Sequence, residues 1–98
     1  MAHIIWSPQA IDDLDAICEY ISRDSPQYAS VVAERIINVV ELIPMHPLAG
    51  SVVPEFGSDE LRERFLHNFR IIYRIRKDWI DLVTICHGSR LLPSELNE

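Results

Sequence analysis

Four side chains in the last third of the chain offer the clearest chemistry: Arg70, Arg74, His87 and Arg90. The planar guanidinium fork of arginine matches both phosphate and carboxylate groups. Histidine titrates near neutral pH and can act as a general acid. Such a cluster could hold RNA phosphate or the acidic residues of a protein partner. The structural alternative is that the arginines are solvated and His87 is a capping or core residue.

The sequence around these residues predicts three short strands, at about Leu61–Leu66, Phe69–Arg76 and Trp79–His87. Side chains alternate between the two faces of a strand, so one face of the middle strand carries Phe69, Ile71, Tyr73 and Ile75. The other face carries Arg70, Ile72, Arg74 and Arg76. The dipeptides at 67–68 and 77–78 suit two-residue hairpin turns. Antiparallel pairing then brings the end of the last strand, with His87 and Arg90, near Arg70.

Two amphipathic helices are predicted before these strands. The same start signal, a serine N-cap followed by proline, occurs at residues 7–8 and 25–26. Apolar residues then recur at three- and four-residue spacing, which predicts one helix from about Pro8 to Arg23 and a second that ends at Pro44. The short connection makes them a helical hairpin. The solvent side of the first helix is expected to carry Asp12, Asp13, Asp15 and Glu19.

The remaining segments complete the fold. His3–Trp6 suits a short first strand that pairs at an edge or beside the last strand, and Met45–Asp59 is predicted to be a loop. The expected fold class is α+β, with the order β-α-α-β-β-β in a single domain over residues 1–98. A helical hairpin packs on one face of an antiparallel sheet. The opposite face is expected to be open to solvent, with the arginines projecting from it.

Charge is distributed unevenly along the chain. The formal net charge of −6 argues against a protein that holds nucleic acid by bulk electrostatics. Residues 1–50 carry two basic and seven acidic side chains, whereas residues 62–77 carry six basic side chains and one acid, Glu63. The sequence therefore predicts an acidic helical half and a basic sheet. The basic cluster is either a solvated sheet face or a binding surface.

Other kinds of site are not indicated. The chain has no glycine-rich phosphate loop, and its histidines and cysteines lack metal-ligand spacing, so no cofactor and no metal are expected. Cys18 and Cys86 lie in apolar-periodic segments and are expected to be reduced core thiols. The N-terminus does not read as a secretory signal, and no apolar stretch approaches the roughly 20 residues that span a bilayer. We therefore expect a cytoplasmic protein without a membrane partner.

Several stretches, taken in order, resemble one family. They are the opening IIWSPQAIDDLDAICEYI, the helix end PMHPLAG, the strand FRIIYRIR and the closing VTICHGSRLLP. Together they look like the RelE/ParE toxins of bacterial type II toxin–antitoxin modules, also known as plasmid stabilisation systems, over about Ile4 to Pro93. The resemblance implies a compact toxin that forms a hetero-oligomer with a cognate antitoxin and is neutralised by it.

The family divides by mechanism. RelE-like members resemble ribonucleases that cut mRNA in the ribosomal A site, with basic sheet residues and a Tyr or His near the C-terminus. ParE-like members share the fold, lack that set and poison DNA gyrase. Here Arg70 matches the phosphate-holding strand arginine, and His87 is the one candidate acid. The closing HGSRLLP and the net acidity favour the ParE-like branch.

The resemblance therefore implies a gyrase inhibitor without catalytic residues, whose partner-binding surface comprises Arg70, Arg74, His87 and Arg90. The alternative is a ribosome-dependent mRNA endonuclease, with Arg70 and Arg74 on phosphate and His87 as the acid. A third possibility is a non-toxic relative that retains only antitoxin binding.

Overall fold

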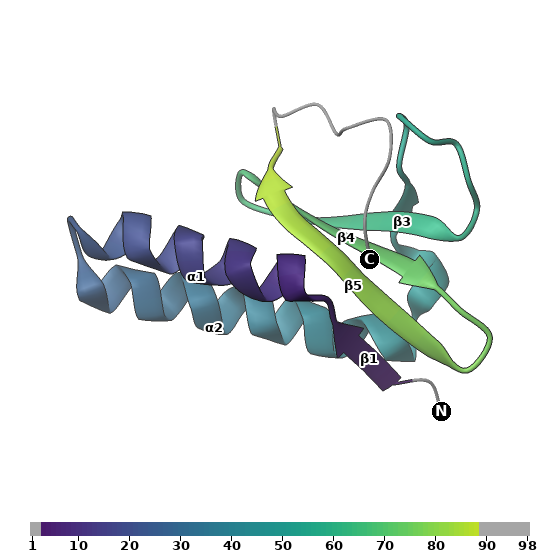
Figure 1. Cartoon of the computed structure of the whole chain (residues 1–98), viewed down its shortest axis with the longest axis horizontal. Helices are drawn as coiled ribbons and strands as arrows, with labels where there is room; N and C mark the ends of the chain where they lie inside the picture. The colour runs from purple at the N-terminus through teal and green to yellow at the C-terminus, as the bar shows by residue number, and fades with distance from the viewer. Residues whose placement is uncertain (1–2, 89–98) are drawn as a thin grey trace.

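The computed structural model describes residues 3–88 and contains two α-helices and one five-stranded sheet. The strands are β1 (His3–Trp6), β2 (Ser51–Val52), β3 (Leu61–Leu66), β4 (Phe69–Ile75) and β5 (Trp79–His87). The helices are α1 (Pro8–Ser22) and α2 (Pro26–Leu42), followed by two 3-10 turns, η1 (Ile43–Met45) and η2 (Pro47–Ala49). The two helices form a hairpin beside the sheet, and the turn between them extends beyond the strands (Figure 1). The α+β class is confirmed.

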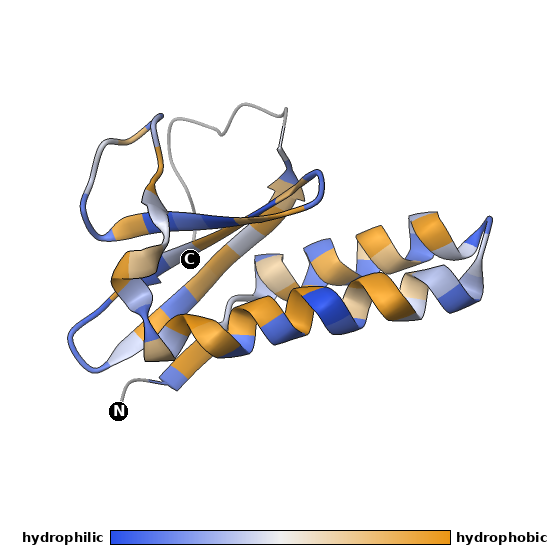
Figure 2. Ribbon diagram, turned by 180° about the vertical axis from the view of Figure 1, so that it is seen from behind, coloured by the Kyte–Doolittle hydropathy of each residue, from blue (hydrophilic) through white to orange (hydrophobic). Residues whose placement is uncertain are grey.

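The helix starts follow the predicted capping signals. The Ser7 hydroxyl accepts a hydrogen bond from the Ala10 N–H at 3.0 Å, and the Ser25 hydroxyl accepts one from the Tyr28 N–H at 3.1 Å. These bonds satisfy donors that the first helical turn leaves without intrahelical partners. Both helices carry polar and apolar stripes (Figure 2), as an amphipathic pair requires. No helix in the described part of the chain combines the length and hydropathy needed to cross a bilayer.

The sheet has the order β1-β5-β4-β3-β2. The strands β3, β4 and β5 form the predicted antiparallel meander, and β1 pairs with β5 in parallel at the sheet edge, as expected for the first strand. The two-residue strand β2 pairs with β3 and lies inside the segment predicted to be a loop. It is too short to show the alternation that identifies strands in a sequence.

The helix-side face of the sheet carries the larger of two buried clusters, and the predicted packing of the helical hairpin on this face is confirmed. Buried residues of both helices pack there against Ile71 and Tyr73 of β4 and against Ile80, Leu82 and Ile85 of β5. Phe69 and Ile75, the other two residues predicted on this face, pack against the same cluster. The alternation in β4 therefore holds along the whole strand.

The opposite face, called here the far face, is not open to solvent, and that expectation is wrong. It carries a second buried cluster of Val53, Leu61, Ile72, Val83 and Cys86, with Phe56 packed against it. Val53 and Phe56 belong to the loop 53–60, which follows β2 and crosses this face. The physical reason is that the far face carries apolar side chains as well as arginines, and their burial favours a covering segment.

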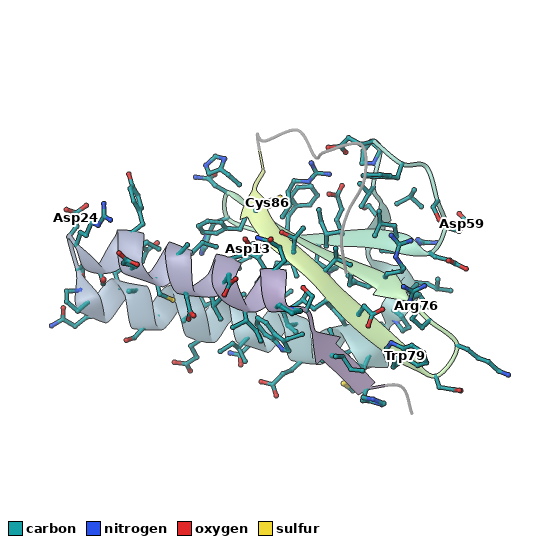
Figure 3. All side chains as sticks on the ribbon, viewed as in Figure 1. Asp13, Asp24, Asp59, Arg76, Trp79 and Cys86 are labelled. Atoms are coloured by element: carbon teal, nitrogen blue, oxygen red, sulfur yellow. The ribbon has the colours of Figure 1, made fainter. Side chains whose placement is uncertain are left out.

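Asp13 also departs from its predicted place on the solvent side of α1. Its Oδ2 accepts hydrogen bonds from the Thr84 hydroxyl and, at 3.0 Å, from the Ile85 N–H of β5. Asp13 lies on the part of α1 that approaches β5 (Figure 3). Parallel pairing with β1 ends at Leu82, so this carboxylate satisfies a strand donor beyond the end of β1.

Candidate functional site

The structure does not bring the four predicted site residues into one cluster. Arg70 and Arg74 lie on the far face, on the same side of β4 as Ile72. His87 pairs with Phe69 in the sheet register and lines a groove on the helix side. Arg70 pairs with the preceding residue of β5, Cys86. Since adjacent residues of a strand point to opposite faces, His87 and Arg70 are separated by the sheet. Arg90 lies outside the described residues.

Arg70 is buried, with 5% of its surface exposed. Its Nε donates to Glu63 Oε1 at 2.7 Å, while Nη1 and Nη2 donate to Glu55 Oε2 and Oε1 at 2.7 and 2.9 Å. Hydrogen bonding to Glu55 raises the pKa of Arg70 above its ordinary value, with a further contribution from Glu63 and against an opposing effect of burial. The guanidinium therefore keeps its charge and is held by two carboxylates.

Arg74 lies at the other end of β4, opposite Leu61 of β3 and Asp81 of β5. Its side chain is half-buried. Asp81 also accepts hydrogen bonds at 2.9 Å from Arg76 Nε and from the Trp79 indole N–H; Figure 3 labels both donors. This end of the far face therefore combines cationic and acidic groups and is not a row of arginines alone.

His87 is exposed, and its ring meets the Phe69 ring edge-on, with centroids 6.4 Å apart. Both rings line an apolar groove of about 450 Å³ between the helical hairpin and the β3–β4 turn. The other lining residues are Ala16, Ile17, Tyr20, Ile21, Tyr28, Val32, His67 and Asn68. Arg35 of α2 contacts His67 across the groove rim, with 3.3 Å between Nη1 and Nε2. No acidic residue is among the lining residues of the groove.

These positions limit the chemistry that the described residues can perform. A general acid must lie within hydrogen-bond reach of the group that it protonates, and His87 is on the opposite face from the guanidinium of Arg70. Within residues 3–88 no group of three or more histidine, cysteine or carboxylate side chains is arranged to hold a metal ion. The groove instead has the character of a binding surface, with apolar walls and basic or titratable groups at its rim.

The sequence predictions missed both carboxylates that hold Arg70. For Glu63 a signal was present: a two-residue turn at 67–68 pairs Phe65 with Arg70, which makes Glu63 a diagonal neighbour on the same face. Glu55 gave no such signal, because it belongs to a loop without periodicity. Its approach to Arg70 follows from the path of the loop 53–60 over the second buried cluster.

Comparisons with known proteins agree with this fold. Residues 4–92 match the model of the family described as ParE toxin of type II toxin-antitoxin system, parDE. The chain is 30% identical over 95 residues to "Putative toxin Y4kP" of Sinorhizobium fredii, a match that covers 95% of each chain. It is 29% identical to "Toxin RelE2" of Caulobacter vibrioides, covering 93% of this chain and 100% of that one.

A solved structure shares the fold. It is titled as the chromosomal ParDE TA system from P. aeruginosa and superposes with a TM-score of 0.73 at 23% sequence identity, covering 89% of this chain and 95% of the other. The predicted resemblance to RelE/ParE toxins is confirmed. The chain belongs to the ParE toxin family of type II toxin–antitoxin systems.

Proposed function

We propose that this toxin, when free of its antitoxin, inhibits DNA gyrase and does not cut RNA. The observation that carries the proposal is the state of Arg70. A ribonuclease of this fold would need that guanidinium for phosphate, but here it is 5% exposed and donates to both Glu55 and Glu63. A phosphate group would have to displace a carboxylate that already matches the guanidinium fork.

The position of His87 and the charge of the chain support the same proposal. His87 faces the groove on the helix side, whereas Arg70 lies on the far face, so the two cannot act on one phosphodiester without rearrangement. The formal net charge of −6 also opposes entry into a cleft lined by ribosomal RNA. Inhibition by binding needs neither a general acid nor a phosphate-binding group.

A pair of reactions tests this proposal. Purified toxin is added to a gyrase supercoiling reaction and, separately, to a translating extract assayed for mRNA cleavage. We expect loss of supercoiling with intact mRNA. Codon-spaced cleavage with normal supercoiling would replace the proposal with the mRNA endonuclease, and no effect in either reaction would replace it with a non-toxic relative.

Two histidine variants further distinguish a gyrase inhibitor from a ribonuclease. His87→Gln removes the one candidate acid, and His46→Gln removes an exposed histidine from the segment between η1 and η2. A ribonuclease that uses His87 would lose cleavage only in the first variant. For a gyrase inhibitor we expect neither variant to cut mRNA, and His46→Gln to inhibit supercoiling like the wild-type chain.

We also propose that the cognate antitoxin covers the apolar groove on the helix side. Tyr20 and Tyr28 of the groove are 71% and 50% exposed, and a partner that buries them would gain apolar contact area. The basic rim at Arg35 and His67 would favour an amphipathic segment that carries acidic residues beside its apolar ones. Of the partner-binding residues predicted from the sequence, His87 lines this groove, whereas Arg70 and Arg74 lie on the far face.

A further inference from the structure

The far face has a second hollow, lined by Pro54, Glu55, Glu63, Phe65, Arg70 and Gly88. Within it, Glu55 takes the place that an oxyanion ligand would take on Arg70. Its two carboxylate oxygens meet Nη1 and Nη2 at 2.7 and 2.9 Å. This two-point fork is the geometry with which arginine binds phosphate and carboxylate groups.

The two carboxylates around Arg70 are not equivalent. Glu63 is fixed on the neighbouring strand β3, and its side chain is 4% exposed. Glu55 comes from the loop 53–60, and its side chain is 24% exposed. Both carboxylates line the hollow, but Glu63 is nearly buried and orients the guanidinium, whereas Glu55 is the more solvent-accessible of the two. Without Glu55, Arg70 would still be paired and would still point toward the hollow.

We propose that Glu55 is a specificity-determining residue that keeps the phosphodiester groups of nucleic acid away from Arg70. Glu55 is tethered beside the guanidinium, so its effective concentration there is on the order of millimolar or higher. A single external phosphate contact does not compete with this internal carboxylate. The inference rests on the proposed function, since it names the residue that separates this toxin from phosphate-binding chemistry.

The loop is held independently of the Glu55 side chain. Val53 is fully buried, its N–H donates to the Leu61 C=O at 3.1 Å, and Phe56 packs against the second buried cluster. Gly57 has a φ of 63°, a left-handed conformation that glycine adopts without steric cost. Removal of the Glu55 carboxylate should therefore leave the path of the loop in place.

The test compares Glu55→Ala with Glu60→Ala, which removes an exposed acid from the same loop. Each protein is titrated with inorganic phosphate and, separately, with a short single-stranded oligoribonucleotide. The Nε–Hε resonance of Arg70 reports binding at the site. We expect Glu55→Ala to bind both probes at least about tenfold more tightly than the wild-type chain, because the internal competitor is gone. Glu60→Ala should match the wild-type chain.

Three outcomes would overturn the inference. Equal gains in affinity for the probes in both variants would show a general charge effect. A response to inorganic phosphate alone would exclude a phosphodiester ligand. An unchanged Arg70 resonance in folded Glu55→Ala would exclude the site. If Glu55→Ala unfolds, as judged by its thermal transition, the isosteric Glu55→Gln variant decides by the same criteria. The supercoiling reaction uses the wild-type chain, so failure of the proposed function would be seen separately.

Discussion

The helix-side face and the far face of the sheet both bury apolar residues, but different parts of the chain cover them. Two long helices cover the helix-side face, and their buried cluster includes Ile36 and Val40 of α2. Among residues 3–88, the loop 53–60 covers the far face, where the buried cluster is smaller and the side chain of Arg70 lies beside it with Glu55 and Glu63.

Apolar burial therefore dominates the packing of the helix-side face, whereas the far face also contains a buried ionic cluster. Apolar burial is non-directional and favours any close packing of the two helices. A buried ionic cluster contributes little or nothing to net stability, but it is costly to break, so it specifies one arrangement. The far face is therefore expected to be sensitive to single charge changes, whereas the helix-side face should respond to partner binding at its groove.

The largest expected effect is on the far face. Arg70→Met leaves Glu63, which is 4% exposed, without its cation, and removing one partner of a buried ion pair costs about 3–5 kcal/mol. The double variant Arg70→Met with Glu63→Met should recover most of that loss, because no uncompensated charge remains buried. Urea unfolding at neutral pH measures the free energy of unfolding of each variant.

Arg76→Met is the matched control for this prediction. Arg76 also pairs with a carboxylate, Asp81, but its side chain is 37% exposed, so its loss should cost at most about 1 kcal/mol. If Arg70→Met were no more destabilising than Arg76→Met, the far face would not depend on its ionic cluster. The contrast between the two faces would then be lost.

An intermediate effect is expected in the groove on the helix side. Tyr20→Glu places a carboxylate among the apolar lining residues and should weaken antitoxin binding by about 1.5–3 kcal/mol, or roughly 10- to 150-fold in Kd. Isothermal titration with the purified antitoxin measures the change. Ile11→Glu adds the same charge to an exposed position of α1 that does not line the groove, and its Kd should change little. Equal losses in both variants would place the antitoxin elsewhere or indicate a general charge effect.

The same comparison shows what the sequence could predict. The helices and the three meander strands follow from local signals: a serine-proline start, apolar residues at helical spacing, and alternation in β4 between Ile71 and Ile72. The helix-side core follows from them, because each element presents one apolar face. The prediction that Arg70 and Arg74 share the opposite face was also correct.

The burial of the far face could not be predicted in this way, because the loop 53–60 that covers it has no periodic pattern. Val53 and Phe56 are isolated apolar residues in a loop that contains proline and glycine, and nothing local indicates that they pack against Ile72. The register of β5 adds a second difficulty. Ile72 pairs with Thr84 and Tyr73 with Leu82, so Val83 is an extra residue in β5 that reaches the far-face cluster. Irregular backbone of this kind reverses the alternation that sequence analysis relies on.

The smallest predicted effect is a dependence of the free energy of unfolding on alkaline pH, which arises from Tyr73 on the helix side. Tyr73 on the helix side is fully buried, and its hydroxyl donates to the Pro47 C=O. Burial raises the pKa of Tyr73 above its ordinary value of 10.0, an effect opposed by hydrogen bonding to Gly50. In the unfolded chain the phenol ionises first as the pH rises, so the stability gained from the neutral phenol is present below pH 10 and is lost as the pH rises through the folded pKa.

Tyr73→Phe should therefore cost about 1 kcal/mol at neutral pH through the lost hydrogen bond. Between pH 10 and the folded pKa of Tyr73, this difference should shrink by up to about 1.4 kcal/mol for each pH unit, and above the folded pKa it should stay constant. Urea unfolding of both chains across this range measures the difference. The groups that titrate elsewhere are common to both chains and cancel. Arg70 keeps its charge over the same range, so its ion pairs with Glu55 and Glu63 on the far face should persist at alkaline pH. A difference that stays constant with pH would mean that ionisation of Tyr73 does not contribute, and the two faces would then respond alike.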